Sequence, residues 1–278
     1  MELSLQLQDS PNEDSLDEAS EVDSLFDSSS PIHNLFPNLP NTRTDSPSQH
    51  YTDIPIAQRP KPSISGLFFD PSVLIPEELA TSLTEHTNRY FSNSIGSGRV
   101  NQVMFFGRAT KNGSGLPHFL DELILTLSLL LERHLPPQAH MLLFPPMTGS
   151  SPRASRQAIL NHYTAGEGIS PHVDLLTRFA DGIVAVSLGS GTVMTFRRVV
   201  DGSSTGEPEE GDRCDVYLPE RSVLVLTGDA RFKWTHGIEG RLADCVVGDG
   251  EPSWIKRGTR VSITLRWLLP GADVVGNI

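Results

Sequence analysis

Residues 158–198, AILNHYTAGEGISPHVDLLTRFADGIVAVSLGSGTVMTFRR, contain four short strand-like runs that are separated by glycine, proline and aspartate. Each run is five to eight residues long and mostly apolar or β-branched, which is typical of a β-strand. Three similar runs follow: SVLVLTG (222–228), FKWTHGI (232–238) and RVSITLRWL (260–268). Seven strands at this spacing predict a β-sandwich or a β-barrel.

Two helices are predicted ahead of these strands. One spans residues 71–91, and the other spans residues 118–135 and ends before Pro136. Short strands are predicted at residues 66–70 and 102–109. The sequence therefore predicts an α+β domain in which the helices pack on one face of a sheet.

The first 60 residues differ in composition from the rest of the chain. They contain eleven acidic residues against two basic ones, many serines and prolines, and only short apolar islands. A segment with so little apolar surface is typically disordered. We therefore predict a disordered acidic tail over residues 1–60 and one folded domain over residues 61–278. The islands could dock on a protein partner, although a solvated tail is the simpler interpretation.

The formal net charge of −12 largely reflects this tail. Residues 61–278 hold 23 acidic and 20 basic residues, so the charge of the folded domain does not exclude a nucleic-acid ligand. Residues 201–215 carry six acids against one arginine and are expected to form a mobile loop between two strands.

The sequence also argues against secreted and membrane proteins. Cys214 and Cys245 are too few for a disulfide framework and lack the paired spacing of a zinc site. No apolar run reaches the roughly 18 residues of a membrane span, and the N-terminus lacks the basic start and apolar core of a secretory signal. We expect an intracellular monomer, in the nucleus or the cytosol, that does not bind membranes.

Two histidines and one aspartate have the arrangement of a metal site. His172 and Asp174 lie two positions apart at the end of a strand-like run, so their side chains point the same way. His236 lies 64 positions after His172, at the end of another run. Two histidines and a carboxylate form the facial triad of non-haem iron oxygenases, which leaves positions open for a cosubstrate and O₂. Each part alone is weak, because H-x-D also arises by chance.

The last predicted strand, residues 260–268, has one polar face. Arg260, Ser262, Thr264 and Arg266 alternate with apolar residues that take the other face. Such a face borders either solvent or a wet cavity. Two arginines with hydroxyls between them favour a cavity that binds a dicarboxylate.

An earlier predicted strand offers two further donors. Asn161 and Tyr163 share one of its faces, and His162 takes the other. The amide and the phenol could bind the same anion as the arginines.

The compound pattern resembles the AlkB family of Fe(II)- and 2-oxoglutarate-dependent dioxygenases. It runs from Asn161 to Arg266 as N-x-Y, a glycine-rich turn, H-x-D, SLG, a strand ending in glycine, R…W-T-H-G-I with its arginine at Arg231, and two arginines six positions apart. The region before Ala158 matches the family weakly. The resemblance implies a double-stranded β-helix, or jelly-roll, with helices bracing one sheet, which agrees with the predicted strands.

The resemblance also implies roles for the matching residues. Fe(II) would be bound by three of them: His172, Asp174 and His236. The cosubstrate 2-oxoglutarate would be bound by six: Asn161, Tyr163, Arg260, Ser262, Thr264 and Arg266. Arg260 would pair with the distal carboxylate of the cosubstrate, and Arg266 would lie near its metal-bound end. Ser262 stands where the bacterial enzyme has an asparagine.

The implied reaction uses O₂ to decarboxylate 2-oxoglutarate and hydroxylates a substrate C–H bond. A hydroxylated N-methyl carbon would leave as formaldehyde, whereas another carbon would remain an alcohol. The sequence does not decide between these two outcomes.

Within the family, the chain is most similar to the tRNA wobble-uridine hydroxylase branch. The similarity lies in GISPHVD, SLGSGTVMTF and LPERSVLVLTGDARFKWTHGI. It favours a nucleic-acid substrate, RNA over DNA, whose base is single-stranded or flipped out. Leu176 stands where the bacterial DNA-repair enzyme has a second acidic residue, which makes direct demethylation of the bacterial kind less secure.

Two groups of residues are candidates to contact such a substrate. Residues 102–115 would fall in the nucleotide-recognition lid of the family, where Met104, Phe105 and Phe106 could stack on bases or belong to the core. Six cations in predicted loops or at strand ends could contact phosphates, although solubility is the simpler role of each: Lys111, Arg153, Arg156, Arg178, Lys256 and Arg257.

Two other functions stay open. The same site could serve an oxygenase that acts on a protein or a lipid. A non-catalytic binding protein is the weakest alternative, because every expected metal and cosubstrate residue is present.

Overall fold

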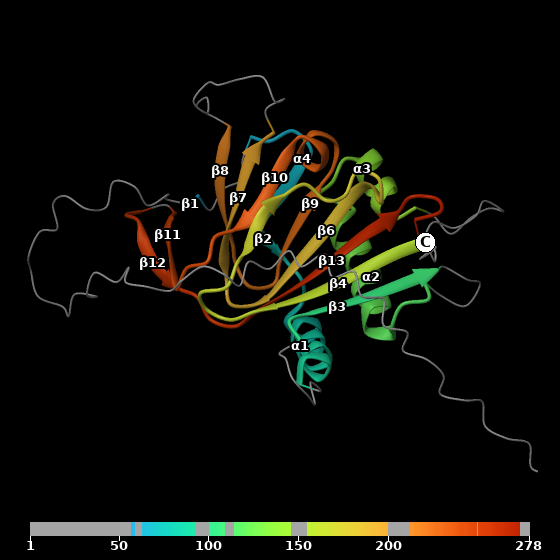
Figure 1. The fold of residues 1–278 in the computed structure, drawn as a ribbon, viewed down its shortest axis with the longest axis horizontal. Helices are drawn as coiled ribbons and strands as arrows, with labels where there is room; N and C mark the ends of the chain where they lie inside the picture. The colour runs from blue at the N-terminus through green and yellow to red at the C-terminus, as the bar shows by residue number, and fades with distance from the viewer. Residues whose placement is uncertain are drawn as a thin grey trace, which may run out of the picture.

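The computed structural model describes residues 57–58, 63–92, 100–108, 114–145, 155–199, 212–248 and 250–272. These residues form two facing β-sheets, and the helices α1, α2 and α3 cover the outer face of one of them (Figure 1). None of the helices in these ranges is long and apolar enough to cross a bilayer.

The first sheet has six strands, and each is antiparallel to its neighbours. In spatial order they are β2 (Leu67–Leu74), β9 (Ser222–Leu226), β6 (Phe179–Gly189), β13 (Arg260–Leu268), β4 (Ser155–Tyr163) and β3 (Gln102–Arg108). Strand β13 therefore lies inside the sheet, whereas β3 forms one of its edges.

The second sheet has seven strands. In spatial order they are β12 (Ser253–Lys256), β11 (Ala243–Val247), β1 (Ala57–Gln58), β8 (Arg213–Leu218), β7 (Thr192–Arg198), β10 (Trp234–Ile238) and β5 (Ile169–His172). Strand β1 is parallel to both neighbours, and the other pairs are antiparallel. From β4 to β7 the chain alternates between the two sheets, which is the winding of a jelly roll.

The alternation of side chains along β13 divides the core into two layers. Val261, Ile263 and Leu265 face the helices α1 (Glu77–Ser92), α2 (His118–Leu131) and α3 (Pro137–Leu143). A second apolar layer lies between the sheets and includes Phe69, Met194, Phe196, Leu224 and Ile238. The predicted separation of the apolar residues of β13 onto one face is confirmed.

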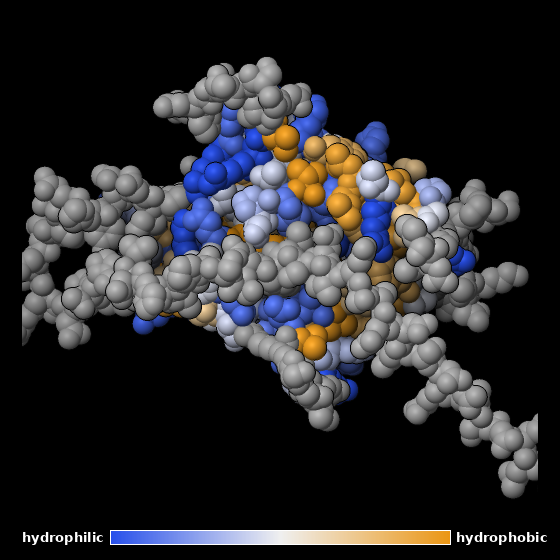
Figure 2. Space-filling view, viewed as in Figure 1, coloured by the Kyte–Doolittle hydropathy of each residue, from blue (hydrophilic) through white to orange (hydrophobic). Residues whose placement is uncertain are grey.

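Hydrophobic side chains also reach the surface. Figure 2 shows them gathered at the end of the molecule where α3 and the short helix α4 (Gly228–Phe232) lie. The exposed large apolar residues include Met141, Leu142, Leu175, Leu176 and Phe232.

The predicted helix over residues 71–91 is wrong in its first part. Strand β2 continues to Leu74, and α1 begins only at Glu77. Strand β2 lies at an edge of its sheet and its register shifts between Phe69 and Leu74. Pro71 is tolerated there because an edge or a bulge does not need its missing N–H group.

Strand β1 corrects the predicted boundary of the tail. Ala57 is 0 % exposed and pairs with Val246, while Gln58 pairs with Val216 on the other side. These two residues belong to the fold, whereas the prediction for residues 1–56 lies outside the described residues. The loop predicted at 201–215 is also too long, because β8 begins at Arg213; residues 201–211 lie outside the described residues.

Candidate active site

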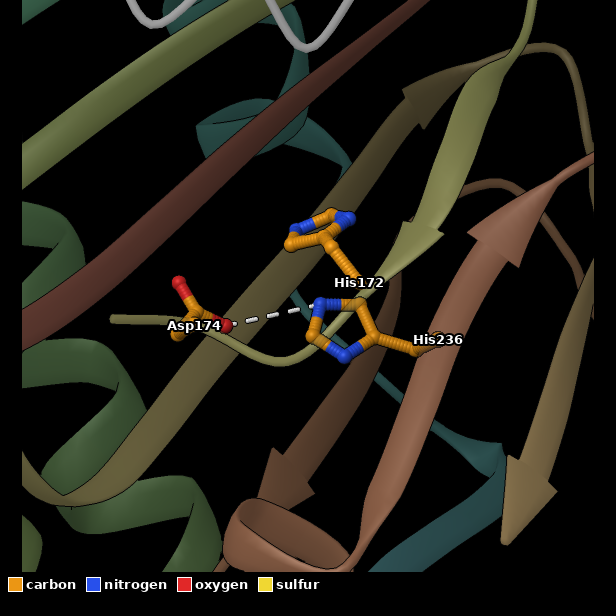
Figure 3. A group of neighbouring side chains, drawn as sticks. All are labelled: His172, Asp174 and His236. Carbon is orange, nitrogen blue, oxygen red and sulfur yellow. Dashed lines mark ion pairs between the residues drawn. The ribbon is translucent and has the colours of Figure 1, made fainter. Parts of the chain in front are cut away.

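Strands β5 and β10 bring the two predicted histidines side by side. His172 and His236 are partners in the antiparallel ladder, and their ring centroids lie 4.5 Å apart. Asp174 follows β5 by two residues and is 5 % exposed. The candidate ligand atoms of the three side chains lie within 4.8 Å of one another (Figure 3). The structure thus brings the predicted triad together, and Fe(II) binding stays a prediction.

The protonation of the triad suits a divalent cation. The Nδ1 of His172 lies 2.8 Å from the Ser170 carbonyl oxygen, which can only accept a hydrogen bond, so Nδ1 is the donor and Nε2 is the nitrogen left to face a metal ion. Burial, together with the nearby His172 and Arg231, lowers the pKa of His236 to about 3. The Nε2 of His236 lies 3.5 Å from Oδ2 of Asp174 (Figure 3). Two imidazoles, of which that of His236 is neutral, and a carboxylate fit a first-row transition metal.

Arg266 contacts the carboxylate of the triad. Its Nη1 donates a hydrogen bond to Oδ1 of Asp174, and its Nε donates to Oε1 of Gln157 at 2.9 Å. The guanidinium lies 4.0 Å from the centroid of the Phe179 ring. Because Gln157 and the Phe179 ring hold its guanidinium in place, Arg266 fixes the orientation of the carboxylate group.

Arg260 is a buried cation with unused donors. It is 5 % exposed, and its Nη2 donates to Oγ of Ser187 at 2.9 Å. Its Nε and Nη1 are buried and have no hydrogen-bond partner within the described part of the chain. Burying a charged group without partners is unfavourable, and a carboxylate is the natural acceptor for a guanidinium. These residues therefore fit one carboxylate of 2-oxoglutarate.

The remaining predicted cosubstrate residues lie on the same face of β4 and β13. Across this ladder Arg260 is the partner of Tyr163, and Ser262 is the partner of Asn161. Burial raises the pKa of Tyr163, and this rise is partly offset by the positive charge of Arg260 and by hydrogen bonds with Ser262, Arg260 and Asn161. Thr264 lies on this face between Ser262 and Arg266 and is half-buried.

Sequence reasoning missed the residues that hold this set in place. Gln157 binds Arg266, Ser187 binds Arg260, and Gln102 Nε2 donates to Oδ1 of Asn161 at 2.9 Å. Gln157 could have been found, because it lies four positions before Asn161 on the same strand face. Gln102 and Ser187 become visible only when the strands are paired.

Two of the predicted phosphate contacts are wrong. Arg156 is 6 % exposed; its Nη2 donates to the Leu143 carbonyl at 2.6 Å, and its guanidinium stacks 3.9 Å from the Trp267 ring centroid. The side chain of Arg257 is 6 % exposed and forms a two-pronged ion pair with Asp244 at 2.6 and 2.7 Å.

The other four candidate cations differ in exposure, and two of them are not described by the structure. Lys256 is exposed and Arg178 is half-buried. Lys111 and Arg153 lie outside the described residues.

Comparisons with known proteins agree with this site. Residues 107–266, more than half of the chain, match the model of the 2OG-Fe(II) oxygenase superfamily. The chain is 37 % identical over 122 residues to a Xenopus tropicalis protein named tRNA (carboxymethyluridine(34)-5-O)-methyltransferase alkbh8, covering 40 % of this chain and 18 % of that protein. It is 36 % identical over 157 residues to an Arabidopsis thaliana protein named alkylated DNA repair protein ALKBH8 homolog, covering 53 % and 42 %.

A zebrafish protein, Danio rerio probable RNA/DNA demethylase ALKBH6, is 28 % identical over 130 residues, covering 41 % of this chain and 53 % of that protein. The chain thus spans about half or less of the length of each of these relatives. Fe(II), 2-oxoglutarate and O₂ are the metal, the cosubstrate and the oxidant of the superfamily whose model it matches. The chain belongs to the 2OG-Fe(II) oxygenase superfamily and, within it, to the AlkB family.

Proposed function

We propose that this AlkB-type oxygenase acts on a nucleic-acid base, in RNA rather than DNA, and that it hydroxylates the base or removes an N-methyl group from it. The observation that carries the proposal is an exposed apolar edge that continues the site face of the first sheet.

The edge strand β3 supplies this surface. Its residues Met104 and Phe106 are paired with Ile159 and Gln157 of β4, so their side chains lie on the face that carries Gln157 and Arg266. Met104 is 40 % exposed and Phe106 is 47 % exposed. Phe105 points to the other side and packs against the helix layer. Of the three candidate stacking residues, Met104 and Phe106 therefore remain, and Phe105 belongs to the core.

A cation lies beside this edge. The guanidinium of Arg178 lies 5.8 Å from the ring centroid of Phe106. Its buried Nε has no hydrogen-bond partner among the residues that the structure describes. The exposed Leu175 and Leu176 belong to the loop that also carries Asp174. A flat apolar surface with an adjacent guanidinium suits a nucleotide, whose base stacks while its phosphate accepts hydrogen bonds.

The names of the similar proteins support the same substrate class. The Xenopus protein is named for tRNA, and the zebrafish protein is named for RNA and DNA. The exposed ring of Phe106 supports the same substrate class from within this chain. A base can stack on this ring only when it is unpaired, so the substrate should be single-stranded or flipped out.

Each residue of the site would have a separate role in this reaction. When bound, Fe(II) supplies, with 2-oxoglutarate and O₂, the oxidising power that breaks a substrate C–H bond. His172, Asp174 and His236 would hold the metal on one face and leave the other face to the reactants. Arg266 would keep Asp174 oriented. Arg260 would anchor the distal carboxylate of the cosubstrate, and its burial would exclude competing water.

The test compares two exposed apolar residues. Phe106→Ala removes the stacking surface and should weaken binding of single-stranded RNA about tenfold, since stacking is worth ~1–3 kcal/mol per base. It should leave the affinity for 2-oxoglutarate unchanged. Leu125→Ala removes an exposed side chain from α2 and should change neither. Nucleoside mass spectrometry after incubation with tRNA would then identify the modified base.

Salt dependence provides the second measurement. Contacts with several phosphates make RNA affinity fall steeply as salt is added. An iron-loaded protein that consumes 2-oxoglutarate but shows no salt-dependent binding to tRNA or single-stranded oligonucleotides would contradict the proposal and favour a protein substrate.

A further inference from the structure

Arg231 is a buried cation that stands in the sequence pattern R…W-T-H-G-I but for which the sequence predicts no role. It lies in α4, the single turn of helix between β9 and β10, five residues before His236. It is 2 % exposed and is the largest of the fully buried side chains in the described residues. Burying a guanidinium is unfavourable unless its donors are satisfied. Both terminal nitrogens of Arg231 have acceptors, whereas its buried Nε has no hydrogen-bond partner among the described residues.

The donors of Arg231 bind the loop that carries Asp174. Its Nη1 donates to the carbonyl oxygen of Asp174 itself at 3.0 Å. Its Nη2 donates to the carbonyls of Leu175 at 3.4 Å and Phe179 at 3.1 Å. No carboxylate is among these acceptors. One side chain thus holds both ends of the turn that leads from the metal-ligand candidate Asp174 into β6.

The start of helix α4 is also fixed in place. Both carboxylate oxygens of Asp181, in β6, accept hydrogen bonds from the backbone N–H of Gly228 at 3.0 and 3.2 Å, and Gly228 is the first residue of α4. The short helix is therefore tied to β6 at its start, and Arg231 ties it to the Asp174 loop near its end. The chain then continues directly into β10, which carries His236.

We infer that Arg231 is a positioning residue, which holds the backbone of Asp174 at a fixed distance from His236 so that the two side chains can share one metal ion. This inference rests on the proposed metal-binding role of the triad. Arg266 orients the Asp174 carboxylate, whereas Arg231 fixes the backbone behind it. Outer contacts of this kind set ligand geometry in metalloproteins.

The shape of the side chain explains why arginine is needed. A planar guanidinium presents several donors in fixed directions, so it can reach three carbonyls of one turn at once. A lysine would keep the charge but could not reproduce this fork. A glutamine would keep one short donor group and lose the charge.

The test measures metal binding rather than turnover. Purified full-length protein is titrated with Mn(II) without cosubstrate, and the remaining free Mn(II) is measured by electron paramagnetic resonance. Wild type should bind one ion and His172→Ala should not. If wild type does not bind Mn(II), the proposed metal site itself fails, which is a different result from failure of the positioning role.

The matched control is Arg156→Gln. Arg156 is also a buried arginine that donates to a backbone carbonyl, but it packs against Trp267 and Leu143 instead of the triad. Both glutamine variants should lower the melting temperature. Only Arg231→Gln should weaken Mn(II) binding, by roughly 10- to 100-fold at a temperature well below its melting point. The Mn(II) affinity of Arg231→Lys should lie between those of wild type and Arg231→Gln.

Two results would overturn the inference. One is a folded Arg231→Gln or Arg231→Lys protein with Mn(II) affinity within twofold of wild type. The other is failure of both variants to fold while Arg156→Gln folds, because Arg231 would then be a general structural residue.

Discussion

His172 and His236 occupy facing positions of the β5–β10 ladder. The backbone pairing of the two strands does not depend on their side chains. Replacing His172 should therefore remove a metal-ligand candidate with little loss of stability. We expect His172→Ala to abolish Mn(II) binding and 2-oxoglutarate turnover while its melting temperature stays within a few degrees of wild type. Calorimetry and a succinate assay measure the two effects.

His162→Ala is the matched control for this prediction. His162 also lies in a strand, next to Asn161, but its ring packs against Phe91 of α1 on the far side of the sheet. Its loss should lower stability and leave metal binding intact. Full turnover in His172→Ala would mean that the triad does not hold the metal.

The unused donors of Arg260 lead to a prediction about the cosubstrate. Arg260→Lys replaces a fork by a point charge, and the lost charge-assisted hydrogen bonds are worth ~1.5–3 kcal/mol. We expect the dissociation constant for 2-oxoglutarate to rise roughly 10- to 100-fold. Isothermal titration with a redox-inactive metal measures this constant without turnover.

The control for Arg260→Lys is Arg213→Lys, which alters a more exposed ion pair with Asp215 and Glu239. It should leave the constant unchanged. Equal affinities of wild type and Arg260→Lys for the cosubstrate would refute the anchor role.

The sequence could place the arginines on strand faces but could not predict which of them are structural. The period of two along residues 260–266 is enough to place Arg260 and Arg266 on one polar face. Nothing in the sequence separates them from Arg156 or Arg257, because an arginine becomes structural only through a partner that the fold supplies. For Arg257 that partner is Asp244, thirteen residues away, and for Arg156 it is the Leu143 carbonyl.

At the scale of elements, the strands with a clear pattern were predictable. Residues 192–198 and 260–268 are strands β7 and β13 with the predicted bounds. Strands β8, β11 and β12 were not predicted, and neither were α3 and α4. The second sheet explains much of this, because β11 and β12 are short strands at its edge: β12 pairs with β11, and β11 pairs with β1. Helix α4 has five residues, too few for a periodic pattern.

Strand β1 gives a prediction at this scale. Its two residues join β11 to β8, and Ala57 packs with Val193, Tyr217 and Val246. Deleting residues 1–54 should leave the melting temperature unchanged if the acidic segment is solvated. Deleting residues 1–60 also removes β1 and should lower the melting temperature by several degrees, since each lost kcal/mol shifts a domain of this size by ~2–4 °C.

Differential scanning calorimetry of the two truncated proteins checks this prediction. Equal melting temperatures would show that β1 contributes nothing to stability. A large drop with the shorter deletion would show that the acidic segment is part of the fold.

At the scale of the whole molecule, charge is divided unevenly along the chain. Residues 1–54 hold eleven acidic residues and one basic residue, Arg43, so most of the net charge of −12 lies there. The domain that carries the triad is close to neutral. If RNA is the substrate, its phosphates must approach this domain in the field of the acidic segment, which repels them at low ionic strength.

Removing residues 1–54 should therefore strengthen RNA binding at low salt. The Debye length is ~30 Å at 0.01 M and ~8 Å at 0.15 M ionic strength, so the difference between the full and the shortened chain should shrink as salt is added. Fluorescence anisotropy with a single-stranded oligoribonucleotide across a salt series measures both effects. The affinity for 2-oxoglutarate serves as the internal control and should be the same for both chains, because the predicted cosubstrate residues, such as Arg260, are buried inside the domain. Equal RNA affinities at low salt would show that the acidic segment does not shield the site electrostatically. Weaker RNA binding by the shortened chain would show that the segment itself contributes to RNA binding.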